Sequence, residues 1–362
     1  MGKRLAVFTI MFLALCVTSK AQNNTALKGS VQRIKVHGKC LEGNLDGDSP
    51  DRDVSVYLPP SYKSNPQKRY PVVYFLHGFT DNDAQWYGFQ KHWINLPHIV
   101  DSVFAAGGAT EMIFVTPNAY TRFAGSFYSS SVTTGDWEDF VAKELVAYID
   151  AHYRTIPNAG SRGLAGHSMG GYGSMRIGQK HPEIFSSVYL LSPCCLMPSV
   201  DVNTPQYQQR IPAMDSAMRS VKTMADFENA GFMTKADFAT AAAWAPDPNK
   251  APFYLDFPYT NGQRNPVVEA KQLANMPLVT LDQYILNLKQ LNGLAFDAGN
   301  RDENIAASIK QLDSSLNSYG LKHGFEIYEG DHLNRIAERI AQKMLPFFSE
   351  RLLTSDTRKK NK

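Results

Sequence analysis

The sequence predicts an α/β fold in which a mostly parallel central sheet is flanked by helices. Short continuous apolar runs, which are typical of strands buried on both faces, alternate with segments of helical period. This alternation favours parallel strands joined by right-handed crossovers. An antiparallel hairpin is expected before the sheet, and an insertion at residues 196–277 interrupts the alternation.

Residues 1–21 have the features of a secretory signal peptide. Lys3 and Arg4 form a basic start, the stretch from Leu5 to Val17 is apolar, and small residues precede Gln22. The apolar stretch is shorter than the roughly 20 residues that a transmembrane helix needs. We therefore expect export to a periplasmic or extracellular location, without an integral membrane span.

The rest of the chain is expected to form one domain, residues 22–355, followed by a basic tail at residues 356–362. Losing residues 1–21 removes three of the 37 basic residues and none of the 34 acidic ones, which leaves a nearly neutral protein. Because no basic stripe is present, we expect no nucleic acid partner.

Three cysteines follow residue 21, namely Cys40, Cys194 and Cys195. Their odd number excludes complete disulfide pairing, and the adjacent pair could form only a strained bridge. We expect all three to be small buried hydrophobic residues.

Residues 29–62 alternate apolar and polar side chains, as in an antiparallel hairpin with a long polar connection. Four acidic residues lie in or near that connection: Asp46, Asp48, Asp51 and Asp53. They lack the spacing and the terminal Glu of a calcium loop, so a solvated turn is expected instead.

A continuous apolar run at residues 70–76 ends in His77-Gly78-Phe79-Thr80. A glycine at a strand end lets backbone amides approach a ligand closely, so the N–H of Phe79 is a candidate oxyanion donor. A helix around residues 94–106 and a second buried run at 112–116 follow. The loop at residues 118–134 then lies at a strand's carboxyl end, where open α/β sheets bind ligands.

The stretch Gly166-His167-Ser168-Met169-Gly170-Gly171 lies between a short apolar run and a segment of helical character at residues 172–181. In a G-x-S-x-G nucleophile elbow, larger side chains two residues from the serine would collide with neighbouring backbone. We therefore predict Ser168 as a nucleophile. The N–H of Met169, at a helix N-terminus, is the second candidate oxyanion donor. A glycine-rich turn with an incidental serine is the weaker alternative.

After this helix, a strand at residues 188–191 ends near Cys194, and the strand–helix alternation breaks. Residues 196–277 contain several methionines and an aromatic run at 253–259. We interpret this insertion as a cap over the active face, with a purely structural packing role as the alternative. Other amphipathic helices are expected at residues 137–153, 281–291 and 336–351.

A serine hydroxyl becomes a good nucleophile when a histidine accepts its proton and a carboxylate orients that histidine. His332 follows a strand at residues 325–328 and is the predicted base, whereas His323 precedes that strand and would lie at the opposite end of the sheet. Asp302 and Asp297 each follow a strand and satisfy the chain order serine, acid, histidine.

These motifs resemble the esterase D-type branch of the α/β-hydrolase superfamily, which includes feruloyl and acetylxylan esterases, S-formylglutathione hydrolases and mycolyltransferases. The resemblance covers residues 30–195 and 290–350. It rests on Tyr57-Leu58-Pro59-Pro60, Leu76-His77-Gly78, the stretch around Ser168, Gly299-Asn300-Arg301-Asp302 and Gly330-Asp331-His332. It implies an α/β-hydrolase fold, selects Asp302 as the acid, and supports Phe79 and Met169 as oxyanion donors. The insertion at 196–277 and the missing aromatic residue after His332 depart from the family pattern.

The resemblance and the proposed triad predict a secreted serine carboxylesterase that forms an acyl-enzyme and needs no metal or cofactor. The expected partner is an ester substrate, an acylated carbohydrate with a feruloyl or acetyl group; the sequence predicts no particular oligomeric state. An acyltransferase with a sugar acceptor is one alternative, and a noncatalytic carbohydrate-binding relative is another. The candidate substrate contacts are Trp86, Phe127, Tyr128 and Cys194.

Overall fold

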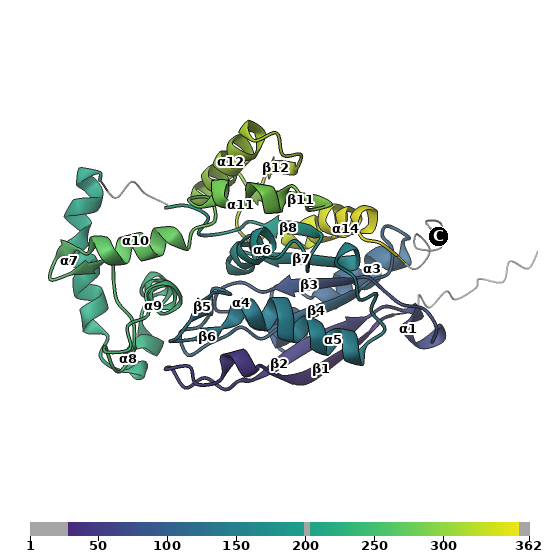
Figure 1. The fold of residues 1–362 in the computed structure, drawn as a ribbon, viewed down its shortest axis with the longest axis horizontal. Helices are drawn as coiled ribbons and strands as arrows, with labels where there is room; N and C mark the ends of the chain where they lie inside the picture. The colour runs from purple at the N-terminus through teal and green to yellow at the C-terminus, as the bar shows by residue number, and fades with distance from the viewer. Residues whose placement is uncertain (1–27, 199–202, 355–362) are drawn as a thin grey trace, which may run out of the picture.

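The computed structural model describes residues 28–198 and 203–354. The predicted signal peptide at residues 1–21 and the basic tail at 356–362 lie outside the described residues. Within the described ranges, no helix has the length and apolar character needed to cross a membrane. A central sheet has helices on both faces, and a further block of helices lies beside it (Figure 1).

Eight strands of the described chain form one sheet, in the order β1-β2-β4-β3-β7-β8-β11-β12 (Figure 1). The pairs β1–β2 and β2–β4 are antiparallel, and the remaining neighbours are parallel. The predicted hairpin and mostly parallel sheet are therefore confirmed. The strands are β1 (Ser30–His37), β2 (Asp51–Leu58), β3 (Val72–Leu76), β4 (Ile113–Pro117), β7 (Arg162–His167), β8 (Ser187–Leu191), β11 (Gly293–Gly299) and β12 (Gly324–Tyr328).

Helices cover both faces of this sheet, and two core clusters lie beneath them. The first cluster includes side chains of α4 (Trp137–Asp139), α5 (Leu145–His152), α6 (Met169–Lys180), α11 (Leu281–Leu288) and α12 (Glu303–Ser318). The second includes side chains of α2 (Asp83–Trp86), α3 (Leu96–Ala105), α13 (Ile336–Arg339) and α14 (Leu345–Arg351). Five-residue π-helical turns join α4 to α5 and α13 to α14, so the two long helices predicted there are each interrupted once. The short helix α1 (Ser61–Ser64) follows β2.

Strand β3 shows why its sequence is continuously apolar. Val72, Tyr74 and Leu76 belong to the first core cluster, whereas Val73 and Phe75 belong to the second. Successive side chains of a strand point to opposite faces, so a strand covered on both faces has no solvated position. All five side chains are indeed fully buried.

The connection between β1 and β2 differs from the solvated turn that we expected. Asp46 is only 3% exposed, and Arg122 contacts its carboxylate at 3.3 Å and its carbonyl oxygen at 2.6 Å. Burial raises the pKa of Asp46 to about 7, although the charge of Arg122 acts in the opposite direction. The connection is therefore held against the loop at residues 118–134.

The described part of the insertion forms the block of helices beside the sheet (Figure 1). It is bonded to the loop at residues 118–134. Ser131 Oγ donates to the carbonyl oxygen of Ala242 at 2.5 Å, and the indole N–H of Trp244 donates to Ser129 Oγ at 3.2 Å. Its elements are α7 (Pro205–Ser220), α8 (Met224–Asn229), α9 (Phe232–Trp244), β9 (Tyr259–Thr260), β10 (Gln263–Arg264) and α10 (Pro266–Ala274). The insertion is thus joined to the body by packing and by hydrogen bonds.

Glu138 joins α4 to α6, the helix that follows Ser168. Its Oε2 accepts hydrogen bonds from Arg176 Nε and Lys180 Nζ, both at 2.9 Å. Burial would raise the pKa of Glu138, but the hydrogen bond from His181 and the charges of Arg176 and Lys180 lower it to about 2.

We expect Glu138→Gln to lower the free energy of unfolding at pH 7 by about 3 kcal/mol, the value of a pKa shift from 4.5 to about 2. Because the folded pKa is the lower one, the unfolded state binds the extra proton. The stabilisation is present above pH 4.5 and is lost as the pH falls toward 2. Denaturant unfolding measures the free energy of unfolding at pH 7 and at pH 3. This free energy should fall more between pH 7 and pH 3 in the wild type than in the variant. An equal loss in both proteins would contradict this assignment.

Candidate active site

Ser168 lies at the turn between β7 and α6, in the strand, turn and helix arrangement that the sequence predicts. Its backbone is strained, with φ 57° and ψ −114°. A Cβ at Gly166 would lie 2.4 Å from the carbonyl carbon of Gly170, and a Cβ at Gly170 would lie 1.9 Å from the carbonyl oxygen of Leu76. Both positions therefore require glycine for the turn to close.

The side chains of Ser168, His332 and Asp302 form a hydrogen-bonded row. His332 Nε2 lies 2.9 Å from Ser168 Oγ, and His332 Nδ1 lies 2.5 Å from Asp302 Oδ2. A carboxylate accepts from Nδ1–H, which leaves Nε2 of a neutral imidazole as an acceptor. In this tautomer, His332 can take the proton of the serine hydroxyl.

The two loops that carry Asp302 and His332 are bonded to each other. Asp302 directly precedes α12, and His332 follows β12, the parallel neighbour of β11. The N–H of Arg301 donates to the carbonyl oxygen of Gly330 at 2.9 Å. A Cβ at Gly299 would lie 2.4 Å from the same oxygen, so this close crossing also depends on a glycine.

Asp297, the other acid considered from the sequence, has different partners. It lies within β11, is fully buried, and accepts hydrogen bonds from Tyr189 Oη at 2.6 Å and from Arg339 Nε at 2.9 Å. Burial raises the pKa of Asp297 to about 6, and the charge of Arg339 offsets part of that effect. The structure therefore brings Asp302, and not Asp297, to His332.

The N–H groups of Phe79 and Met169 lie at two neighbouring chain segments. Met169 begins α6, so its N–H belongs to the partly positive helix N-terminus, and Phe79 follows β3, which pairs with β7. Among the hydrogen bonds of the described residues, neither N–H has an acceptor. A Cβ at Gly125 would lie 2.7 Å from Met169 Sδ and 2.8 Å from Phe79 Cδ2, so the loop at 118–134 packs against both side chains.

Three of the predicted substrate contacts lie beneath the surface. Trp86 and Tyr128 are fully buried, and Phe127 is 2% exposed. The indole N–H of Trp86 donates to Asp81 at 2.9 Å, and the hydroxyl of Tyr128 donates to the carbonyl oxygen of His77 at 3.1 Å. These three side chains are packed within the protein in this structure, and their role in substrate binding stays a prediction. An aromatic side chain near a site can either contact the substrate or pack beneath the site, and the sequence does not distinguish these two roles.

Cys194 does lie beside Ser168, since its N–H donates to the carbonyl oxygen of Ser168 at 3.2 Å. A hydrogen bond with Cys195, together with burial, raises the pKa of the Cys194 thiol well above its usual range. A thiol that keeps its proton is a weak nucleophile. Cys40, Cys194 and Cys195 form no disulfide and are partly buried, and all three pack against the first core cluster.

Exposed hydrophobic side chains around this site were missed by the sequence analysis. Phe232 of α9 is 61% exposed, and its ring lies 5.5 Å from that of Phe79. Trp93 is 43% exposed and Leu333, next to His332, is 44% exposed. These residues belong to no recognisable motif that could have identified them from the sequence.

His167 holds the backbone of His332 in place. Its Nε2 lies 2.9 Å from the carbonyl oxygen of His332, which can only accept, so His167 is the donor. The rings of Trp86 and Trp93 pack at 5.9 and 5.8 Å from the His167 ring. Burial lowers the pKa of His167 to about 3, and the charge of His332 acts in the same direction. His167 is therefore a neutral donor near neutral pH.

The Esterase family, described as "Putative esterase", matches residues 49–335, a range that contains Ser168, Asp302 and His332. This match covers more than half of the chain. The chain belongs to the Esterase family.

Curated relatives resemble parts of this esterase-family chain. It is 31% identical over 167 residues to an endo-1,4-beta-xylanase/feruloyl esterase of Xylanibacter ruminicola. The aligned stretch covers 45% of this chain and 22% of that protein. It is also 29% identical over 135 residues to an esterase of Mycobacterium tuberculosis. That aligned stretch covers 37% of this chain and 27% of the relative. The chain thus spans about a quarter of the length of the curated relatives it matches.

Solved structures match nearly the whole chain. A ferulic acid esterase gives a TM-score of 0.59 at 22% identity and covers 90% of this chain and 99% of its own. An S-formylglutathione hydrolase from Agrobacterium tumefaciens gives a TM-score of 0.55 at 17% identity and covers 91% of this chain and 98% of its own. At these identities the likeness concerns the fold, and it confirms the predicted α/β-hydrolase fold.

If Ser168 and His332 act as predicted, we expect His167→Ala to slow the reaction of Ser168 with a fluorophosphonate probe by roughly 10- to 100-fold, because a small misplacement of His332 is enough for such a loss. His167→Gln, whose amide can donate to the same carbonyl oxygen, should recover part of the rate. Probe labelling followed over time, with thermal unfolding as a check on folding, measures both. If the folded alanine variant reacts at the wild-type rate, the positioning role is refuted.

Proposed function

We propose that this protein is a serine carboxylesterase with Ser168 as the nucleophile, His332 as the base and Asp302 as the orienting acid. The observation that carries the proposal is the row of hydrogen bonds from Ser168 Oγ through His332 to Asp302. Nucleophile, base and orienting group within hydrogen-bond reach are the geometric signature of an activated serine. Membership of the Esterase family supports the same reaction class.

In the proposed mechanism, Ser168 Oγ attacks the ester carbonyl carbon while His332 Nε2 accepts the hydroxyl proton. The N–H groups of Phe79 and Met169 stabilise the oxyanion that develops on the carbonyl oxygen. The imidazolium, held by Asp302, returns its proton to the alcohol as the C–O bond breaks, and an acyl-enzyme remains. Water then transfers a proton to His332 and attacks the acyl carbon, which releases the acid and regenerates the serine.

We infer that the substrate is an acylated carbohydrate met after export. Two observations support this inference, namely the signal-like sequence of residues 1–21 and the likeness to a relative named as a xylanase and feruloyl esterase. We also propose that the insertion at 196–277 acts as a cap, because Phe232 of α9 packs against Phe79 beside the proposed oxyanion donors.

We expect the protein expressed without residues 1–21 to hydrolyse 4-nitrophenyl esters of short acids and methyl ferulate. Ser168→Ala should lower kcat by on the order of 10⁶-fold, since nucleophile and base act as one unit. Product analysis with and without a sugar acceptor separates hydrolysis from acyl transfer. If wild type and variant are equally inactive on the whole panel, the esterase proposal fails.

We expect Asp302→Asn to lower kcat by on the order of 10⁴-fold, because an amide beside Nδ1 favours the wrong imidazole tautomer. Asp297→Asn should instead change kcat by far less, because Asp297 binds Tyr189 and Arg339 and does not contact His332. Steady-state kinetics and denaturant unfolding of both variants provide the comparison. Loss of turnover in the Asp297 variant alone would reverse the assignment.

A further inference from the structure

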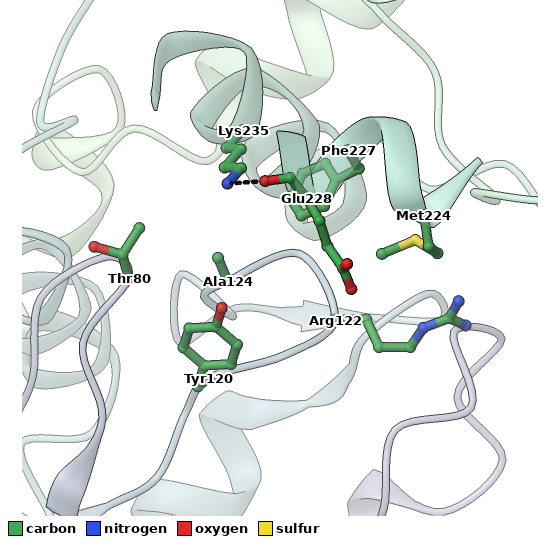
Figure 2. A pocket seen from close by; sticks show the side chains of 8 residues that line it. All are labelled: Thr80, Tyr120, Arg122, Ala124, Met224, Phe227, Glu228 and Lys235. Atoms are coloured by element: carbon green, nitrogen blue, oxygen red, sulfur yellow. Dashed lines mark hydrogen bonds between the residues drawn. The ribbon is translucent and has the colours of Figure 1, made fainter. Parts of the chain in front are cut away.

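A cavity of about 550 Å³ lies between the insertion and the loops that follow β3 and β4 (Figure 2). Phe227, Glu228 and Lys235 line it from the side of α8 and α9. Thr80, Tyr120 and Ala124 line it from the opposite side. The proposed mechanism uses none of these six side chains, so the cavity needs an explanation of its own.

The cavity lining includes two side chains of opposite charge, Glu228 and Lys235. Lys235 Nζ donates one hydrogen bond, to the carbonyl oxygen of Glu228 at 2.7 Å, and its other N–H groups remain for a ligand. In the part of the chain that the structure describes, the carboxylate of Glu228 has no partner, and Figure 2 shows it directed into the cavity. Arg122 also borders the cavity, where its Nη1 binds Asp46.

This arrangement fits a neutral ligand rich in hydroxyl groups. An anion would meet the carboxylate of Glu228 and a cation would meet the ammonium of Lys235, so neither charge is favoured. Neighbouring hydroxyls can donate to the first group and accept from the second. The Tyr120 side chain, 43% exposed, offers an aromatic surface for the C–H face of a sugar ring.

The cavity adjoins the segment that carries the proposed oxyanion donor. Thr80 directly follows Phe79, and the N–H of Thr80 donates to the carbonyl oxygen of Ala124 at 3.0 Å. Helix α9 carries both Lys235, which lines the cavity, and Phe232, which packs against the Phe79 ring. A molecule with its ester carbonyl at Phe79 could therefore extend past this ring into the cavity.

We propose that the cavity is a saccharide subsite, which binds a glycosyl unit of the substrate at a distance from the ester bond. The proposal rests on the proposed esterase function and specifies which part of the substrate the insertion recognises. Glu228 and Lys235 bind ring hydroxyls, and Tyr120 packs against the ring. Recognition of this unit lowers KM for sugar esters and is absent for simple alkyl esters.

The test compares two substrates with the same acyl group, a feruloylated arabinoxylan trisaccharide and methyl ferulate. Glu228→Gln keeps the backbone carbonyl that binds Lys235 and removes only the charge. We expect it to lower kcat/KM on the trisaccharide ester by roughly 10-fold or more, as for loss of a hydrogen bond to a charged group, with less than about twofold change on methyl ferulate. Lys235→Met and Tyr120→Ala should also lower kcat/KM on the trisaccharide ester and leave methyl ferulate nearly unchanged.

Matched controls come from α12 and α14, which contribute no residue to the cavity lining. Tyr319→Ala, at the end of α12, removes a tyrosine that is 42% exposed, and Glu350→Gln alters an exposed carboxylate on α14. Neither control should distinguish the two substrates. A parallel loss on both substrates in the Glu228 and Tyr120 variants would overturn the saccharide subsite while leaving the esterase proposal intact.

If the wild type hydrolyses neither substrate, the proposed function fails, and a binding experiment then decides the subsite. Isothermal titration of Ser168→Ala with xylotriose should give millimolar binding that the added Glu228→Gln change weakens about 10-fold or more. Absence of binding, or binding that the second change leaves unaltered, would overturn the subsite.

Discussion

The closest backbone approach at the site, between Gly170 of α6 and Leu76 of β3, constrains everything around it. No Cβ fits there, and the chain before Gly170 must turn so sharply that Ser168 adopts a positive φ. The same approach sets the start of α6, with the N–H of Met169, beside the segment after β3 that carries Phe79. One steric constraint therefore places the serine hydroxyl and the two proposed oxyanion donors together.

Carboxylates in this fold divide by their partners. Glu138 and Asp297 are buried against arginine; Glu138 joins α4 to α6, and Asp297 joins β11 to α13. Asp302 has no arginine at its Oδ2, which lies 2.5 Å from His332. A carboxylate that pairs with an imidazole rather than a permanent cation remains able to stabilise a charge that appears only during reaction. In the proposed mechanism, the two kinds of acid thus serve stability and chemistry separately.

Sequence reasoning was accurate where a pattern reports a local requirement. Continuous apolar runs identified the buried strands, because both faces of β3 enter cores. Glycine spacing identified the turn at Ser168. The sequence reasoning failed for Asp46, which is buried and bound by Arg122, a residue 76 positions further along the chain. Residue type alone does not report the accessibility of a side chain.

The sequence by itself determined the order of the strands along the chain, the sharp turn at Ser168, and the candidates for nucleophile, base and acid. These features depend on local sterics and on chain order. Only the tertiary structure separated Asp302 from Asp297 by contact, placed His167 against the carbonyl of His332, and joined α8 and α9 to the loops after β3 and β4. Those contacts link segments far apart in the chain. Their distances depend on how the whole sheet and the insertion pack, which no local pattern encodes.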